Sequence, residues 1–162
     1  MEAADELTQL WNVLKGDMSL VGPSPNVKRE TDPYTPEEKK LLSVKPGITD
    51  FASIVFSDEC EILKDQADPD IAYNQLIRPG KGRLGLFYIA NRSLWLDIRL
   101  CWLTAIAILS RPRALAVVQS ILRSLGATAD LLDVAAREKP LMPAPPPGCD
   151  RIVTSRDGNP FI

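Results

Sequence analysis

The chain has 162 residues, of which 19 are Lys or Arg and 21 are Asp or Glu, and it contains no histidine. Its net charge of −2 excludes the strongly basic surface typical of nucleic-acid-binding domains, so no nucleic-acid partner is expected. The lack of histidine excludes a Ser-His-Asp triad, a Cys-His pair and a His-ligated metal. Any acid–base or nucleophilic chemistry must therefore use carboxylates, Lys, Cys or Tyr.

The cysteines and the first residues narrow the class further. Cys60, Cys101 and Cys149 are far apart and form no C-x-x-C pair, so neither a zinc site nor a disulfide framework is expected. Scattered thiols are typical of a reducing compartment. The N-terminal residues are acidic and lack an apolar run, so no signal peptide is predicted.

The first half of the chain is expected to form short helices separated by Pro and Gly. Apolar residues at helical spacing predict a helix over residues 5–14 that ends at Gly16. Residues 19–25 are expected to be a loop. Further along, Thr35 and the Pro that follows it are helix start signals. They predict a helix that runs to about residue 43.

The middle of the chain is less regular. Residues 48–56 are predicted to be strand or otherwise extended. A helix is expected to begin at Asp68 and to stop before Pro79, because proline disrupts a helix interior. Residues 84–91 are helical or extended.

Residues 94–109 predict a strongly apolar helix with Ser93 as its N-cap. The helix is shorter than the roughly 20 apolar residues needed to span a bilayer. Two interpretations remain: a buried core helix, or an interfacial helix with Trp95 and Trp102 at the membrane boundary. Two more helices are predicted over residues 112–125 and 129–138.

Together these elements predict a mostly α fold with short helices, Pro/Gly loops, little strand and an amphipathic late helix. Residues 1–110 are expected to form the main portion and residues 111–139 a helical extension. Five prolines fall between Pro140 and Pro147, so residues 140–162 are expected to be an extended, loosely ordered tail.

Asp5 and Glu6 are adjacent acids at the start of the first predicted helix. Successive helical residues point about 100° apart, so the two carboxylates can face different sides of one pocket. One could be a nucleophile or metal ligand and the other a base. Acids at a helix start also stabilise the helix dipole, and the pair alone does not distinguish these alternatives.

Three sequence motifs, which follow one another along the chain, carry a resemblance to a known family. They are DELTQLWNVLKGDMSLVGPSP over residues 5–25, KPGIT over residues 45–49 and YIANRSLWLDIR over residues 88–99. Their order and spacing resemble the signature of the bacterial sugar transferases, or monotopic phosphoglycosyl transferases, whose first motif reads DELPQLWNVLxGDMSLVGPRP. The resemblance covers roughly residues 4–109.

The resemblance implies transfer of a sugar 1-phosphate from a nucleotide diphosphate sugar, such as a UDP-sugar, to a polyprenyl phosphate such as undecaprenyl phosphate. It implies that Asp5 is the nucleophile that forms a covalent phosphosugar intermediate, and that Glu6 assists the polyprenyl phosphate. A Mg²⁺ ion is expected near Asp5. The residues expected to bind substrate are Pro23, Ser24, Pro25 and Asp97.

The family setting adds a location and an alternative. It implies initiation of exopolysaccharide or glycoconjugate synthesis at the cytoplasmic face of the inner membrane, with the membrane surface as a partner, and it favours the interfacial interpretation of residues 94–109. Members have a membrane-embedded N-terminal part that this sequence lacks, so residues 1–110 are expected to be an N-terminally truncated catalytic portion. The alternative is a catalytically incomplete fragment that serves as a membrane-surface interaction module.

Two departures from the family pattern affect the expected site. Thr8 stands where the family has Pro. Ser24 stands where the family has an Arg that is expected to meet the diphosphate or the nucleotide, so a charged, bidentate contact is lost. Lys28 and Arg29 are candidates to replace it.

Overall fold

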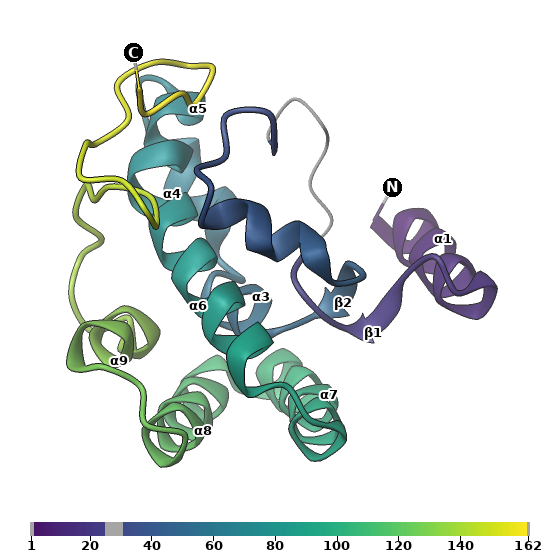
Figure 1. Ribbon diagram of the computed structural model, residues 1–162. Helices are drawn as coiled ribbons and strands as arrows, with labels where there is room; N and C mark the ends of the chain where they lie inside the picture. The colour runs from purple at the N-terminus through teal and green to yellow at the C-terminus, as the bar shows by residue number, and fades with distance from the viewer. Residues whose placement is uncertain (1, 25–30, 162) are drawn as a thin grey trace.

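The computed structural model describes residues 2–24 and 31–161, with side chains from Leu7 onward. Its elements in chain order are α1 (Glu2–Lys15), β1 (Ser19–Val21), the 3-10 helix η1 (Glu38–Ser43), β2 (Gly47–Thr49), α3 (Phe51–Val55), α4 (Glu59–Lys64), α5 (Pro69–Ala72), the π-helix η2 (Tyr73–Ile77), α6 (Arg78–Asn91), α7 (Leu94–Leu109), α8 (Arg111–Ser124) and α9 (Ala129–Ala136). The fold is mostly helical with two short strands, as the sequence predicted (Figure 1).

The local start and stop signals of several helices are confirmed. Gly16 follows α1 with a φ of +85°, a backbone conformation that glycine adopts without strain. Ser93 accepts a hydrogen bond from the Leu96 amide at the start of α7. Thr35 and Glu38 form the predicted capping box, since each side chain accepts a hydrogen bond from the other residue's amide. The helix that follows is of the 3-10 type and begins at Glu38.

The prediction of a loop over residues 19–25 is wrong for its first three residues. Ser19 pairs with Gly47 and Val21 with Thr49, so that β1 and β2 form a two-stranded parallel sheet. The partner strand is far along the chain, and a three-residue strand carries no local periodicity that would reveal it.

The prediction that residues 48–56 are extended holds only as far as residue 49. Asp50 then starts helix α3: its carboxylate accepts a hydrogen bond from the Ser53 amide at 2.7 Å, and the Ser53 hydroxyl accepts one from the Asp50 amide at 2.9 Å. This reciprocal capping box satisfies two amides at the helix start and turns an apolar segment into a short buried helix.

The predicted break before Pro79 is also wrong. Helical backbone continues from α5 through η2 into α6, and the π-helical turn lies directly before Pro79. A proline leaves the carbonyl four residues earlier without its helical partner. Here that carbonyl belongs to Gln75, and it accepts a hydrogen bond from the Ala144 amide of the C-terminal segment at 3.0 Å.

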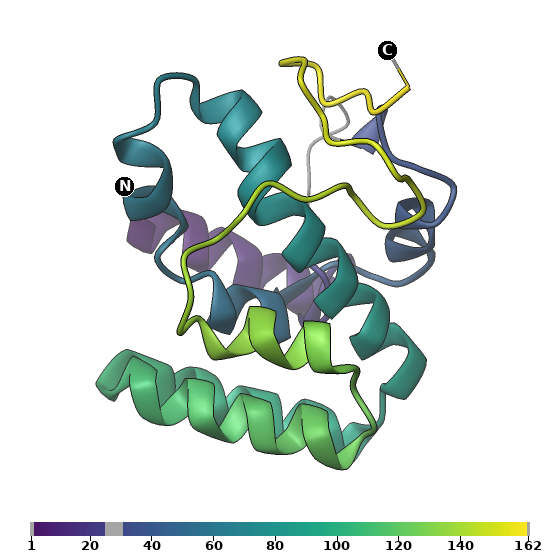
Figure 2. The same ribbon diagram turned by 90° about the vertical axis from the view of Figure 1, so that its left-hand side faces the viewer.

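One hydrophobic core joins α3, α6, α7, α8 and α9 around the long helix α6. Fully buried side chains come from every part of it, including Phe51, Leu84, Leu100 and Leu122. In Figure 2, α7 and α8 run side by side along one edge of the molecule. Residues on both sides of position 110 therefore contribute to the same core.

Helix α7 is buried on one face and exposed on the other. Leu96, Leu100 and Leu103 face the core, whereas Trp95 and Trp102 are 64% and 70% exposed. The interpretation as a buried core helix therefore holds for one face of α7, and the interfacial interpretation of the exposed face stays a prediction. Within the part of the chain that the structure describes, no helix is long and apolar enough to cross a membrane.

The C-terminal segment 140–161 has no helix or strand, yet it lies along α5, η2 and α6 (Figure 2). Pro146 and Pro147 are buried, and Val153 is 1% exposed. The Gln75 side chain donates a hydrogen bond to the Val153 carbonyl at 2.7 Å. Composition indicated an extended segment but did not indicate these contacts.

Candidate functional site

The two strands hold the first and second sequence motifs side by side. The Gly22 amide donates to the Thr49 carbonyl, and the Gly47 amide donates to the Pro23 carbonyl, each at 2.9 Å. A Cβ atom on Gly47 would lie 2.1 Å from the Gly22 nitrogen, so only glycine allows this approach. The result is a fixed position for the loop that carries Pro23 and Ser24.

The third motif is attached to the same strands. The Tyr88 hydroxyl on α6 lies 3.5 Å from the Val21 carbonyl of β1 and donates to the Asp97 carboxylate on α7 at 2.7 Å. Beyond the third motif, the hydroxyl oxygens of Thr49 and Thr104 lie 2.6 Å apart and join β2 to α7. Burial, and then the hydrogen bond to Asp97, raises the pKa of Tyr88 well above its ordinary value. Tyr88 therefore stays a neutral hydrogen-bond donor and links α6 to α7.

Asp50 lies directly after the second motif and is almost completely buried, at 1% exposure. Burial raises the pKa of Asp50 to about 6, although the Ser53 hydrogen bonds and the charge of Lys81 act in the opposite direction. The group is a structural cap of α3 that titrates near neutral pH.

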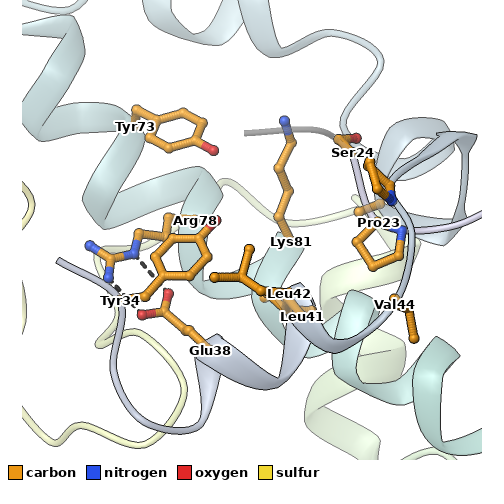
Figure 3. A pocket seen from close by; sticks show the side chains of 13 residues that line it. Pro23, Ser24, Tyr34, Glu38, Leu41, Leu42, Val44, Tyr73, Arg78 and Lys81 are labelled. Atoms are coloured by element: carbon orange, nitrogen blue, oxygen red, sulfur yellow. Dashed lines mark hydrogen bonds and ion pairs between the residues drawn. The ribbon is translucent and has the colours of Figure 1, made fainter. Parts of the chain in front are cut away.

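A cavity of about 190 Å³ opens beside the loop of the first motif (Figure 3). Pro23 and Ser24 form one side of it, and Tyr73 and Lys81 lie on η2 and α6 on another side. Apolar side chains around η1 form the remaining wall; they include Leu41, Leu42 and Val44. The cavity thus combines apolar walls with a few polar groups, which is the usual make-up of a small-molecule site.

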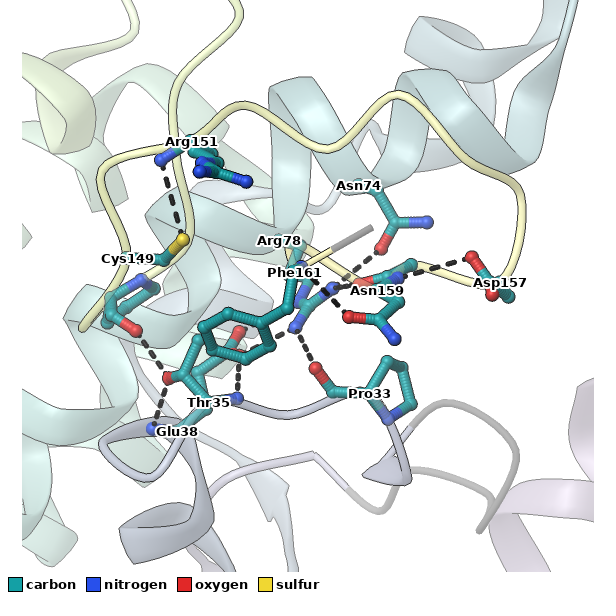
Figure 4. A network of polar contacts seen from close by, with 12 residues as sticks. Pro33, Thr35, Glu38, Asn74, Arg78, Cys149, Arg151, Asp157, Asn159 and Phe161 are labelled. Atoms are coloured by element: carbon teal, nitrogen blue, oxygen red, sulfur yellow. Dashed lines mark hydrogen bonds and ion pairs between the residues drawn. The ribbon is translucent and has the colours of Figure 1, made fainter.

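One end of the cavity is closed by a buried polar network around Arg78 (Figure 4). The guanidinium pairs with Glu38 at 2.6 Å, and the two side chains are 5% and 1% exposed. It also donates to the Asn74 side chain and to the carbonyls of Pro33 and Gly158. Arg78 is therefore committed to protein partners and serves the wall of the cavity.

Lys81 is the other basic residue of the cavity. Its ammonium nitrogen forms an ion pair with Glu59 on α4 and lies 5.6 Å from the centre of the Tyr73 ring. The Lys81 side chain is 23% exposed, so it reaches the cavity from a partly solvated position.

The structure divides the predicted substrate residues between two cavities. Pro23 and Ser24 line the cavity described above, whereas Asp97 lines a second cavity of about 530 Å³ together with Lys45 and Arg92. Asp97 has Tyr88 as its hydrogen-bond partner, and no ion pair joins it to Arg92 within the described residues.

Asp5 and Glu6 lie on the N-terminal part of α1, but their side chains are outside the described part of the chain. Pro25, Lys28 and Arg29 also lie outside the described residues. Their predicted roles stay predictions.

A magnesium ion fits the chemistry of the acid pair. Among the described residues, no group of three or more Cys, Asp or Glu side chains could hold a metal ion. Mg²⁺ commonly uses one or two carboxylates and completes its shell with substrate phosphate oxygens and water. Asp5, with Glu6 beside it, provides that kind of donor set.

Sequence reasoning missed Lys81, Tyr73 and the Arg78–Glu38 pair. The expected break before Pro79 separated Tyr73 from Lys81, and an ion pair between residues 40 positions apart has no local pattern. The useful signal would have been Lys81 and Arg83, the two basic residues within the glycine-rich, largely apolar segment 79–90.

The fold is a small helical domain in which the first two motifs line the cavity beside Ser24, and all three motifs line the second cavity. The profile of the family described as "Bacterial sugar transferase" matches residues 2–111. The chain therefore belongs to the bacterial sugar transferase family.

Several curated relatives match the same region. The chain is 36% identical over 110 residues to the undecaprenyl-phosphate galactose phosphotransferase of Salmonella typhimurium, covering 68% of this chain and 20% of that protein. It is 37% identical over 118 residues to the UDP-glucose:undecaprenyl-phosphate glucose-1-phosphate transferase of Xanthomonas campestris pv. campestris, covering 68% and 21%.

A protein of that same description from Caulobacter vibrioides is 32% identical over 117 residues, covering 68% of this chain and 38% of the relative. The chain thus spans about a fifth to two fifths of the length of these relatives. No solved structure matches the chain at a significant level.

Proposed function

We propose that this chain carries the catalytic portion of a phosphoglycosyl transferase, which moves a sugar 1-phosphate from a UDP-sugar to undecaprenyl phosphate and initiates exopolysaccharide or glycoconjugate synthesis. The observation that carries the proposal is the meeting of the three family motifs around strands β1 and β2, where all three line one cavity and the first two line the cavity beside Pro23 and Ser24. The names of the relatives, which include UDP-glucose and undecaprenyl phosphate, support the substrate classes.

The proposed chemistry begins at Asp5. Its carboxylate oxygen attacks the phosphorus nearer the sugar and forms a new P–O bond, while the bond from that phosphorus to the bridging oxygen breaks. UMP leaves with the bridging oxygen and its electron pair. A phosphate oxygen of undecaprenyl phosphate then attacks the same phosphorus, and the Asp5 carboxylate is released. Glu6 assists the incoming phosphate in this second step.

Carboxylate nucleophiles divide a difficult transfer into two easier steps, and no histidine is needed in either. A Mg²⁺ ion bound by Asp5 and the diphosphate would supply charge neutralisation, which phosphoryl transfer requires. The chain's own contribution is to position the diphosphate beside the acid pair.

The membrane surface is part of the proposal because the second substrate is a lipid. The exposed face of α7 supports it: Trp95, Trp102, Ile108 and Leu109 are all at least 64% exposed. Tryptophans on one face of an apolar helix suit the interface between water and lipid. The orientation proposed is at the cytoplasmic face of the inner membrane, where nucleotide sugars are found.

The test measures UMP release from UDP-galactose and UDP-glucose in the presence of Mg²⁺ and vesicles that contain undecaprenyl phosphate. We expect release by the unaltered chain and a loss of at least about 100-fold in Asp5→Ala, because the nucleophile is removed. Asp130→Ala is the matched control, since Asp130 also lies in the first turn of a helix, α9, outside the three motifs.

A second readout identifies the intermediate. With a radiolabelled sugar and no undecaprenyl phosphate, label should remain on the unaltered protein and be absent from Asp5→Ala. Equal UMP release by Asp5→Ala and the unaltered chain would refute the assignment of Asp5 as the nucleophile.

The second candidate function is a non-catalytic interaction module at the membrane surface. It is favoured by Ser24, which replaces the Arg of the family pattern. Vesicle binding without any UMP release would support it over the enzyme.

A further inference from the structure

We propose that Lys81 binds the diphosphate of the nucleotide sugar and replaces the charge that Ser24 cannot supply. The inference rests on the proposed function, because it assumes that a nucleoside diphosphate sugar enters the cavity beside Ser24. It goes further by assigning a binding role to a residue outside the three sequence motifs.

The position of Lys81 in the wall of the cavity suits this role. In Figure 3 its side chain extends from α6 into the space between Tyr73 on one side and Ser24 and Pro23 on the other. The cavity is about 190 Å³, smaller than the roughly 300–1,000 Å³ of a pocket that encloses a whole ligand. It therefore accommodates one part of a nucleotide sugar, with Lys81 near its entrance.

Charge points to the same residue. Of the two basic residues that line the cavity within the described part of the chain, Arg78 is buried and bonded to Glu38, Asn74 and two carbonyls. Withdrawing Arg78 would leave the buried Glu38 carboxylate without a cation, which is costly. Lys81 is consequently the cation of this cavity that can turn to a ligand.

The present partner of Lys81 does not prevent this. Glu59 is 28% exposed and Lys81 23% exposed, and ion pairs that reach solvent contribute little stability. A diphosphate carries more negative charge than one carboxylate and can compete for the ammonium. The centre of the Tyr73 ring lies 5.6 Å from the ammonium nitrogen. The ring attracts the cation both when Lys81 pairs with Glu59 and when it binds a diphosphate.

The chemical class of ligand follows from these groups. A single ammonium beside apolar walls recognises a phosphate as a point charge and does not read a base. We therefore expect Lys81 to contribute to affinity for UDP and not to affinity for uridine, which has no phosphate.

The experiment measures binding of UDP and of uridine to the 162-residue chain by isothermal titration calorimetry. We expect Lys81→Ala to weaken UDP binding about 10-fold, with uridine binding unchanged, and Lys81→Arg to retain most of the UDP affinity. Lys139→Ala is the matched control, because Lys139 also pairs with a carboxylate, Asp133, but is 77% exposed and far along the chain. It should leave both affinities unchanged.

Two further variants separate ligand binding from a structural role. Glu59→Gln releases the ammonium from its partner and should tighten UDP binding by a few fold. Ser24→Arg, placed in the Lys81→Ala background, should restore UDP affinity by supplying a cation from the opposite wall. Thermal melting of each variant reports whether the fold is kept, and Lys81→Gln replaces Lys81→Ala if the smaller side chain prevents folding.

The outcomes distinguish the two proposals. UDP binding that is equal in Lys81→Ala and the unaltered chain overturns the role of Lys81 and leaves the proposed function standing. An unaltered chain that binds neither UDP nor UDP-sugar overturns both. A Glu59→Gln variant with lower stability and no gain in UDP affinity also overturns the role, because the pair would then be structural only.

Discussion

Two carboxylates of this chain are equally buried but have different surroundings. Glu38 and Asp50 are each 1% exposed. Glu38 faces the guanidinium of Arg78 at 2.6 Å, whereas Asp50 accepts hydrogen bonds from Ser53 and has no ion pair among the described residues. A buried carboxylate without a paired cation is costly to ionise, so Asp50 is the group whose protonation should affect stability.

We expect the free energy of unfolding to fall as the pH rises from about 4 to about 6, because of Asp50. Its pKa is raised from 3.8 to about 6 by burial, so in this window the unfolded chain loses a proton that the folded chain keeps. A shift of this size corresponds to about 3 kcal/mol. Above pH 6 the loss from this group is complete. Urea unfolding at a series of pH values measures the effect.

The variant Asp50→Asn should lack this step, because an amide still accepts the capping hydrogen bond but does not titrate. It should exceed the unaltered chain in stability above pH 6 and match it near pH 4. Asp65→Asn is the control, since Asp65 is exposed. Parallel pH profiles for the unaltered chain and Asp50→Asn would contradict the prediction.

At the scale of elements, α7 is the helix that most clearly contacts two environments, the core on one face and the outside of the molecule on the other. Leu96, Leu100 and Leu103 pack into the core, while Trp95 and Trp102 remain exposed on the outer side. The guanidinium of Arg99 lies 5.4 Å from the centre of the Trp95 ring. A basic group beside a tryptophan suits anionic lipid headgroups above an apolar layer.

We expect the double variant Trp95→Ser/Trp102→Ser to reduce binding to anionic lipid vesicles by at least about 10-fold, because two large apolar contacts with lipid are lost. Both side chains are exposed, so the melting temperature should hardly change. Vesicle flotation of purified protein measures the bound fraction.

Val117→Ser is the matched control for this test. Val117 is an exposed apolar residue, at 40%, on the neighbouring helix α8. Flotation that is equal for the double variant and the unaltered chain would show that α7 does not contact lipid.

At the scale of the whole molecule, the C-terminal segment connects parts that are distant in sequence. The Thr35 hydroxyl donates to the Pro147 carbonyl, and the Arg78 guanidinium donates to the Gly158 carbonyl (Figure 4). Thr35 caps the region of η1, and Arg78 begins α6. The segment therefore supports the two elements that form walls of the candidate substrate cavity, although it lies outside the family match.

Val153→Ala should lower the free energy of unfolding by about 2 kcal/mol, because Val153 is 1% exposed and its removal leaves a cavity. Ile152→Ala should change it by less than about 0.5 kcal/mol, since Ile152 is 42% exposed. Urea unfolding compares the two neighbours directly. Equal effects of the two substitutions would mean that the segment does not pack against the core in solution.

Much of the helical fold could be predicted because its signals are local. The Ser93 cap, the Thr35–Glu38 capping box and the glycine after α1 each act within a few residues, where hydrogen-bond and backbone preferences are strong. The strand β1 could not be predicted, since its hydrogen-bond partners are in β2. Pro79 was misread because its effect on the helix depends on Ala144, which satisfies the Gln75 carbonyl from 69 positions away.

By itself, the sequence determined the class of the protein and its helical composition, because these depend on residue types and short spacings; the role of Asp5 and Glu6 stays a prediction. Only the tertiary structure decided that Ser24 and Asp97 line different cavities, and that Lys81 lines the same cavity as Ser24. The physical reason is that a cavity is made by side chains from several elements, and their distances arise only when the core has packed. The sequence contains no histidine, and the charged side chains that line the two cavities in the described part of the chain are carboxylates, lysines and arginines.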